Sequence, residues 1–249
     1  MTRGPMKLQK LYSYVRRALN DYNMIEEGDK IAIGISGGKD SLTLLYALAG
    51  IRDFYPVKFD ICAITVDLGW ENADFSAIKD LCKELNVEYH IEKTEIAKIV
   101  FDERKESNPC SLCAKMRKGT INDLLNEKGV NKIAYAHHKD DVVETMLLSL
   151  MYEGHFHTFA PVTHLDKAGI TIIRPLIYTH EADIISFSKK FKLPVMKSPC
   201  PVDGHTKREY AHNILKEMMK ENPRVKNRMF SAIANSDIPG WKNGEGAHY

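Results

Sequence analysis

The stretch IAIGISGGKDS, residues 31–41, constrains the fold of this chain more than any other. Its β-branched half ends abruptly at a serine and two glycines, and a leucine-rich segment begins directly afterwards. This pattern predicts a buried strand, a tight loop and the first turn of a helix, an arrangement that holds phosphate. The glycines let the backbone approach an anion closely, Lys39 adds a positive charge, and the hydroxyls of Ser36 and Ser41 donate hydrogen bonds. We therefore expect a nucleotide to bind here.

Segments with strand and helix character alternate along most of the chain. Strands are expected near residues 31–35, 57–66, 87–91, 132–136 and 170–173. Amphipathic helices are expected at 7–23, 74–85, 111–128, 140–151 and 181–191, and two short basic helices near 207–221 and 224–235. The alternation predicts an α/β fold with a doubly wound, parallel, five-stranded, Rossmann-like sheet. Its ligand should lie at the carboxyl ends of the strands.

A chain of 249 residues buries one core with at most a small appendage. We expect an N-terminal amphipathic helix within residues 1–27, the nucleotide-binding domain over 28–195 and a small C-terminal helical extension over 196–249, frayed from Pro239 onward. No apolar run approaches the roughly 20 residues of a membrane helix, and the N-terminus lacks a signal-peptide core. We therefore expect a cytoplasmic location without membrane contact.

The net charge of +2 is unevenly distributed. Residues 1–20 hold five lysines and arginines and no acidic residue, and residues 186–228 hold eleven against four. The remainder of the chain is therefore acidic. Two basic ends suggest a polyanionic partner, although solvated helix faces would give the same pattern.

The five cysteines have no disulfide-like spacing and indicate thiols in a reducing compartment. Cys110 and Cys113 form a C-x-x-C pair just before a helix, a spacing shared by redox, zinc and iron–sulfur sites. Arg117 and Lys118 follow the pair and are expected to favour thiolates. A third candidate ligand, Cys200, lies in a proline-rich loop, and no second C-x-x-C pair exists for a four-cysteine zinc site. Three thiolates suit a cluster with one iron open to another ligand.

The glycine-rich loop resembles the PP-loop of the N-type ATP pyrophosphatases, which cleave ATP to AMP and pyrophosphate. The resemblance implies an adenine nucleotide alpha-hydrolase-like fold and adenylation chemistry. It assigns ATP binding to Ser36, Gly37, Gly38, Lys39, Asp40, Ser41, Val66 and Asp67. A backbone pair at Val66 would read the adenine, and Asp67 would meet the ribose or help to hold magnesium. The alternative for Asp67 is a carboxylate that only caps the end of a strand.

Residues 136–141, AHHKDD, resemble the family's GHxxDD segment, with alanine where glycine is usual. Asp141 is the magnesium or catalytic carboxylate in this comparison, since a triphosphate needs its charge compensated. We expect Asp140 to cap the helix instead. His137 is either a nucleotide contact or a packed histidine. By resemblance Arg174, at the end of the fifth strand, points toward the phosphates or the activated base; a surface arginine is the alternative.

Four segments narrow the resemblance to the tRNA 2-thiocytidine synthetase group: residues 110–119, 136–141, 173–176 and 229–233. That group thiolates cytidine in the tRNA anticodon loop and carries a 4Fe-4S cluster on three cysteines, here Cys110, Cys113 and Cys200. The third ligand thus lies in the C-terminal extension. The chain departs from the group where Pro-Val-Asp follows Cys200 in place of a second nearby cysteine, and it is short for the bacterial enzyme. Cys62 and Cys82 lie in apolar segments and are expected in the core.

These features predict a tRNA sulfurtransferase that depends on ATP, magnesium and a 4Fe-4S cluster. AMP is transferred to the C2 oxygen of cytidine, pyrophosphate leaves, and AMP departs when sulfur attacks. The resemblance assigns catalysis to Lys39, Asp40, Asp141 and Arg174. The expected partners are tRNA and a sulfur donor, either a cysteine desulfurase persulfide or sulfide; a homodimer is left open.

Other hypotheses stay open on the sequence alone. The tRNA lysidine synthetases also adenylate the cytidine C2 oxygen but need no cysteine set, and one group of thiouridine synthetases has terminal zinc fingers that this chain lacks. A sulfurtransferase for another tRNA nucleoside or for a small molecule would share the loop and the cysteines; a steep fall of tRNA affinity with salt would favour RNA. A non-catalytic nucleotide or redox sensor is disfavoured by the joint presence of Lys39, Asp40, Asp141 and Arg174.

Overall fold

Five parallel strands form the centre of the sheet in the computed structural model, which describes residues 7–71, 73–105, 109–197, 199–201, 207–241 and 247–248. The strands are β1 (Asp29–Gly34), β2 (Phe59–Asp67), β3 (Glu88–Lys93), β4 (Lys132–Ala134) and β6 (Ile170–Ile173). Their order across the sheet is β3-β2-β1-β4-β6, and every neighbouring pair among them is parallel. The predicted parallel sheet and the places of its five strands are confirmed.

Two further strands that the sequence did not predict extend one edge of the sheet. β5 (Val162–Leu165) pairs antiparallel with β6, and β7 (Ala247–His248) pairs parallel with β5. The turn between β5 and β6 contains Gly169 at φ +62°, a left-handed conformation that favours glycine. β5 (VTHL) and β7 (AH) lack the continuous apolar run by which the equally short β6 (ITII) could be recognised.

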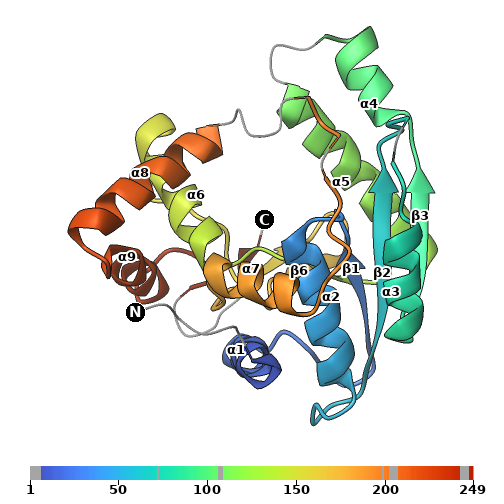
Figure 1. Ribbon diagram of the computed structural model, residues 1–249, viewed down its shortest axis with the longest axis horizontal. Helices are drawn as coiled ribbons and strands as arrows, with labels where there is room; N and C mark the ends of the chain where they lie inside the picture. The colour runs from blue at the N-terminus through green and yellow to red at the C-terminus, as the bar shows by residue number, and fades with distance from the viewer. Residues whose placement is uncertain are drawn as a thin grey trace.

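Helices cover both faces of the sheet (Figure 1). The first face is covered by α1 (Leu8–Asp21), α2 (Lys39–Arg52), α3 (Ser76–Glu84), α6 (Lys139–Tyr152) and α7 (Glu181–Lys190). The second face is covered by α5 (Pro109–Glu127), which packs Leu125 against Ala32 and its neighbours. Ile31 and Ile33 belong to the first core and Ala32 to the second, the period-two pattern of a strand buried on both faces. The predicted doubly wound arrangement is therefore confirmed.

A short helical segment after β3 was not predicted either. α4 (Ile96–Lys98) continues directly into a five-residue π-helix, η1 (Ile99–Glu103). Val100 is buried beneath this segment, whereas the side chain of Phe101 reaches a cavity at the end of β2.

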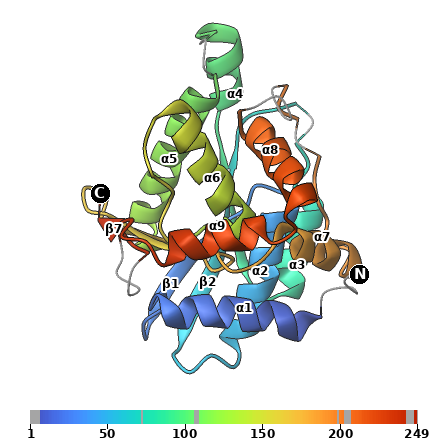
Figure 2. The same cartoon turned by 90° about the vertical axis from the view of Figure 1, so that its left-hand side faces the viewer.

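The C-terminal part consists of α8 (Lys207–Glu221), which packs against α6, and α9 (Val225–Ala234), as Figure 2 shows. Both predicted basic helices are thus confirmed. The expected fraying from Pro239 onward is wrong as far as Trp241, whose side chain is only 2% exposed. Its indole N–H donates to the carbonyl of Phe159 at 3.2 Å, and its ring packs edge-on against Phe230. No helix among the described residues is long and apolar enough to cross a membrane.

Candidate nucleotide and cysteine site

The loop between β1 and α2 is held in shape by its own serines. The Ser36 N–H donates to Ser41 Oγ at 3.2 Å, the Gly38 N–H donates to Ser36 Oγ at 3.3 Å, and Ser41 Oγ donates to the Gly38 carbonyl at 3.0 Å. Gly37 has φ +82°, and a Cβ added there would lie 2.9 Å from Met196 Sδ. The loop is therefore preformed, and both its backbone conformation and its contact with Met196 favour glycine at position 37.

Lys39, the first residue of α2, lies between two carboxylates. Its Nζ is 3.1 Å from Asp40 Oδ2 and 3.1 Å from Glu181 Oε1. Burial lowers the pKa of Lys39, but these carboxylates outweigh burial, and the net pKa is raised. Lys39 is therefore a cation at neutral pH. Glu181, at the start of α7, was not predicted to belong to the site, and nothing in its own segment of sequence marks it.

Asp141 accepts hydrogen bonds through both carboxylate oxygens. Its Oδ2 accepts from the His138 N–H at 2.9 Å, which closes a capping box at the start of α6. Its Oδ1 accepts from Arg208 Nη1 of α8, also at 2.9 Å. The positive charge of Arg208 therefore competes with a metal ion for this carboxylate.

Asp140 does not cap α6 as predicted. The N-cap is His138, and Asp140 lies inside the helix with 4% exposure. Its carboxylate pairs with Lys226 of α9 and accepts from the Glu181 N–H at 3.0 Å. Burial raises the pKa of Asp140, but Lys226 outweighs it, so the net pKa is lowered. Asp140 thus joins α6, α7 and α9 through one buried charge.

Two predicted site residues, Arg174 and His137, do not line the cavity that the loop and the cysteines share. The Arg174 side chain is buried, with 7% exposure, so it is not a surface arginine. Its Nη1 donates to the Ala160 carbonyl at 2.5 Å and to Thr163 Oγ1 at 2.9 Å. The His137 ring packs 4.8 Å from that of Phe159. Burial and the positive charge of Arg174 lower the pKa of His137 to about 4, which leaves the ring neutral.

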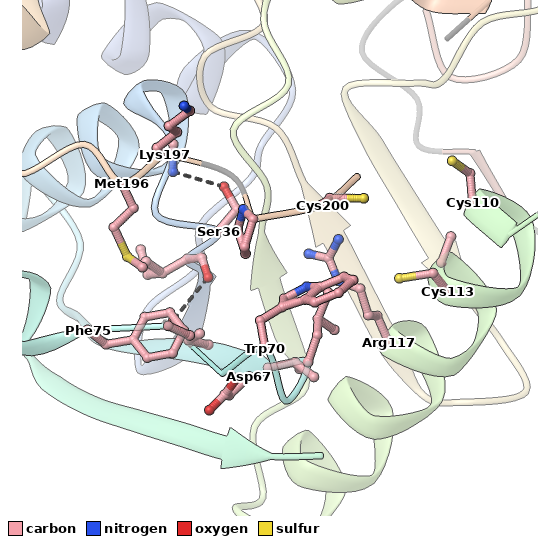
Figure 3. Close-up of a pocket in the computed structure, with 18 of the residues that line it drawn as sticks. Ser36, Asp67, Trp70, Phe75, Cys110, Cys113, Arg117, Met196, Lys197 and Cys200 are labelled. Carbon is pink, nitrogen blue, oxygen red and sulfur yellow. Dashed lines mark hydrogen bonds between the residues drawn. The ribbon is translucent and has the colours of Figure 1, made fainter. Parts of the chain in front are cut away.

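A cavity of about 400 Å³ opens at the carboxyl ends of the parallel strands (Figure 3), where ligands bind in sheets of this kind. It is lined by Ser36 and Gly38 of the loop, by Val66 and Asp67 at the end of β2, and by Cys110, Cys113 and Cys200. The other predicted site residues lie outside this lining: Gly37, Lys39, Asp40, Ser41, His137, Asp141 and Arg174. The structure therefore joins one face of the loop, the end of β2 and the three candidate thiols.

The backbone N–H and C=O of Val66 have no partner strand beside them, because β2 extends past the end of β1 at this residue. The register between β1 and β2 ends at Gly34 and Ile64, and the Ile64 carbonyl accepts from the Ile35 N–H at 2.8 Å. Alternation along a strand turns the N–H and C=O of Val66 to that same side, beyond the last residue of β1. The Asp67 carboxylate also stabilises the turn after β2, because its Oδ1 accepts a hydrogen bond from the Gly69 N–H at 3.0 Å.

The three cysteine sulfurs face a common space (Figure 3). Cys110 and Cys113 lie in the first turn of α5, and Cys200 follows Pro199 in the opposite wall. Burial and the two other thiols raise the pKa of Cys113 against the lowering effect of Arg117. Arg117 thus favours the thiolate of Cys113 as predicted, but burial and the neighbouring thiols outweigh it and the net pKa is raised.

The three cysteines line one cavity but do not form a site for a single ion. Among the described residues, no group of three or more His, Cys, Asp and Glu side chains could hold a single metal ion. Three thiols around one cavity fit the donor set of an iron–sulfur cluster, which is bound by cysteine thiolates spread around several atoms. Cys62 and Cys82 lie outside the lining, and burial raises the pKa of Cys82 to about 11. The expectation that these two cysteines belong to the core is confirmed for Cys82.

Aromatic residues form a wall of the cavity that the sequence analysis missed. Trp70 and Phe75 follow β2, and Phe101 comes from η1; the rings of Trp70 and Phe101 are 5.5 Å apart. The only signal for this wall was the short run Leu68-Gly69-Trp70 after the acidic end of a strand. Apolar rings beside a few polar groups are typical of sites for small molecules and nucleobases.

Residues 8–221 match the family model described as the PP-loop domain. A tRNA-cytidine(32) 2-sulfurtransferase from Geobacter metallireducens is 40% identical over 232 residues, which cover 92% of this chain and 90% of that protein. A protein of the same name from Geotalea uraniireducens is 40% identical over 229 residues, or 91% of each chain. The solved U34-tRNA thiolase NcsA from Methanococcus maripaludis, with its 4Fe-4S cluster, matches with a TM-score of 0.74 and 25% identity over 90% of this chain and 76% of its own. The region matched by the family model contains every residue predicted for the site.

Proposed function

The chain belongs to the PP-loop family, and from this premise we propose that it replaces the C2 oxygen of a tRNA cytidine with sulfur, using ATP and an iron–sulfur cluster. One observation carries the proposal: the phosphate-binding loop, the end of β2 and three thiols line a single cavity. An activated base and its incoming sulfur can therefore meet in one place. The names of the similar proteins, tRNA-cytidine(32) 2-sulfurtransferases and a tRNA thiolase, agree with this chemistry.

The loop is suited to the pyrophosphate end of ATP. The N–H groups of Ser36 and Gly38 now donate to serine hydroxyls at 3.2 and 3.3 Å. These bonds are long, and a charged phosphate oxygen is a stronger acceptor than a hydroxyl. The positive end of α2 begins at Gly38, and Lys39 adds its full charge. The negative charge of the leaving pyrophosphate is stabilised by these donors.

The adenine ring fits at the end of β2. The outward N–H and C=O of Val66 offer one donor and one acceptor, which match the edge of adenine, and Asp67 lies next to them for the ribose or a magnesium ion. The apolar rings of Trp70 and Phe75 supply a surface against which a base can stack.

The reaction proceeds in two displacements. The C2 oxygen of cytosine attacks the α-phosphorus of ATP, the bond from that phosphorus to the bridging oxygen breaks, and pyrophosphate leaves. A sulfur nucleophile at the oxidation level of sulfide then attacks C2, and AMP departs with the original oxygen. No electrons change hands overall. Lys39 remains protonated throughout, so it acts by charge and not by proton transfer.

A cluster and a metal ion also belong to this chemistry. Cys110, Cys113 and Cys200 would hold the 4Fe-4S cluster, which supplies one iron position that is open to a sulfur ligand. Asp141 and Asp67 are the carboxylates that would hold magnesium, which neutralises phosphate charge. Arg208 competes with such an ion for Asp141.

The proposal also covers the sulfur donor, the cellular location, the domain boundaries and the assembly. The sulfur donor is a cysteine desulfurase persulfide, with a reductant, or free sulfide. An iron–sulfur cluster held by cysteine thiolates favours a reducing compartment, hence the cytoplasm. We also propose that the chain divides after residues 27 and 195 and that it forms a homodimer.

The experiment combines anaerobic cluster reconstitution with an assay of tRNA-dependent ATP cleavage. We expect the wild-type protein to gain iron–sulfur absorbance with about four irons per chain, and to convert ATP to AMP and pyrophosphate, not ADP, when tRNA is present. Replacement of Cys200 by alanine should abolish the cluster signal, whereas Cys62→Ala, a matched thiol outside the cavity, should keep it. A protein that binds no iron, or that forms ADP, would refute the proposal.

A further inference from the structure

Exposed apolar side chains concentrate in one part of the molecule. Of nine large hydrophobic residues that stand out as exposed in the described part of the chain, six lie at the end of α6, in the following loop or on α8. They are Leu150, Met151, Tyr152, Phe156, Tyr210 and Met218. Contiguous exposed apolar surface on a folded chain marks an interaction site.

The central part of this surface is an unbroken exposed segment, residues 150–157, LMYEGHFH. Four of its eight residues carry aromatic or imidazole rings, and Glu153 is its single acidic residue. Tyr152 is 48% exposed and Phe156 is 78% exposed. Rings exposed in this way add little to the core and are available to a partner.

The first turn of α8 adds a positive charge and another ring. Lys207 Nζ lies 4.4 Å from the centre of the Tyr152 ring, and Tyr210, one turn further along α8, is 56% exposed. The neighbouring Arg208 points the other way, to Asp141. We call residues 150–157 together with Lys207 and Tyr210 the aromatic platform.

The aromatic platform lies within reach of the candidate site. α6 (Lys139–Tyr152) carries the predicted magnesium ligand Asp141 in its first turn, and its 14 residues place Tyr152 about 20 Å from that end of the helix. In both views α8 and α5 begin on the same upper side of the molecule (Figures 1 and 2). At 3.4 Å or more per nucleotide, this distance corresponds to about six nucleotides of one strand. A single RNA loop spans it.

We propose that the aromatic platform binds unpaired bases of the tRNA loop while the target base lies in the cavity, an inference that rests on the proposed function. Single-stranded RNA is recognised by stacking of its splayed bases on tyrosine, phenylalanine and histidine rings, beside cations that meet the phosphates. The platform has both features. The basic character of residues 186–228, which include Lys207, complements a polyanion.

The test measures binding of a labelled RNA hairpin with the anticodon stem and loop of the substrate tRNA, by fluorescence anisotropy at fixed salt. A second hairpin with the same stem and a four-nucleotide loop serves as the probe for loop recognition. We expect the Tyr152→Ala/Tyr210→Ala double variant to lose roughly fivefold or more in affinity for each base unstacked. Tyr152→Phe/Tyr210→Phe should retain affinity, because phenylalanine stacks equally well.

Two controls make the result specific. Phe54 is 50% exposed at the far end of α2, and Phe54→Ala should leave binding unchanged. Lys207→Ala should lower the slope of log affinity against log salt by about one, as expected for one phosphate contact. The tyrosine variants should leave that slope unchanged.

The outcomes separate this proposal from the one on which it rests. If the wild-type enzyme thiolates tRNA and the double alanine variant binds the natural loop as tightly as wild type, the platform proposal is overturned and the proposed function stands. The same holds if light scattering shows that the variant changes mass, because the patch would then be a contact between copies. If the wild-type enzyme cleaves no ATP with tRNA, the proposed function itself fails.

Discussion

Replacement of Arg208 by alanine should lower the magnesium concentration that the enzyme needs. Arg208 Nη1 donates to Asp141 Oδ1 at 2.9 Å, the oxygen that a magnesium ion would otherwise take. The Arg208 side chain is 44% exposed and that of Asp141 is 18% exposed, so solvent screens the pair strongly. Ion pairs of this exposure contribute about 0.2–1 kcal/mol. Loss of the competing cation should thus lower the magnesium concentration at half-maximal rate by a factor of about 1.4 to 5.

The assay is tRNA-dependent pyrophosphate release at saturating ATP, titrated with magnesium, together with nucleotide binding measured by calorimetry at each magnesium level. Arg224→Ala is the matched control, because it removes the same charge from an exposed position next to α9. We expect the control to leave the magnesium midpoint within error of wild type. A midpoint for Arg208→Ala that is equal to that of Arg224→Ala, or higher than wild type, refutes a competition between Arg208 and the ion at Asp141.

Gly37→Ala should weaken ATP binding at least fivefold in a fluorescence titration. A left-handed backbone costs about 1–2 kcal/mol for an alanine, and the new Cβ would contact Met196. Gly119→Ala is the control and should bind ATP normally, because Gly119 lies in a helix with open space around it. Trp241→Ala should lower the free energy of unfolding by about 3–5 kcal/mol in urea denaturation, because it leaves a cavity in the core; an effect below 1 kcal/mol would mean that this segment is frayed after all. The pKa of His180, lowered to about 4 mainly by burial, is below its value near 6.5 in the unfolded chain. The unfolded state therefore binds more protons between pH 6.5 and 4, and the free energy of unfolding should fall as pH is lowered through that range. His180 alone contributes at most about 1.4 kcal/mol per pH unit to this slope. His180→Gln should reduce the slope, and an unchanged slope would contradict the role of this histidine.

Local patterns were enough to predict much of this molecule. The run from Ile31 to Ser41 contains its own strand, loop and helix start, so its conformation follows from neighbouring residues. The spacing of Cys110 and Cys113 likewise fixes one side of the cavity, since both lie in one helical turn. The five parallel strands were identified because each is an apolar run bounded by turn residues.

The missed features depend on residues that are distant in sequence. Glu181 next to Lys39 and Arg208 on Asp141 could not be inferred from spacing, because helices from separate parts of the chain bring them together. The net rise in the pKa of Cys113 could not be inferred from the sequence for a similar reason. The sequence shows Arg117 one turn away but does not show the burial that outweighs it. Trp241 was missed because a single tryptophan in a polar tail carries no periodic signal.

Mass spectrometry of tRNA nucleosides gives the most direct test of the proposed reaction. Unmodified tRNA would be incubated anaerobically with cluster-reconstituted enzyme, ATP, magnesium and sulfide, then digested to nucleosides. We expect 2-thiocytidine in amounts equal to the AMP released, lost without ATP and in Cys200→Ala but retained in Cys62→Ala. Equal thiolation by the Cys200→Ala variant, or release of AMP without any thiolated nucleoside, would contradict a cavity in which ATP and three thiols act together.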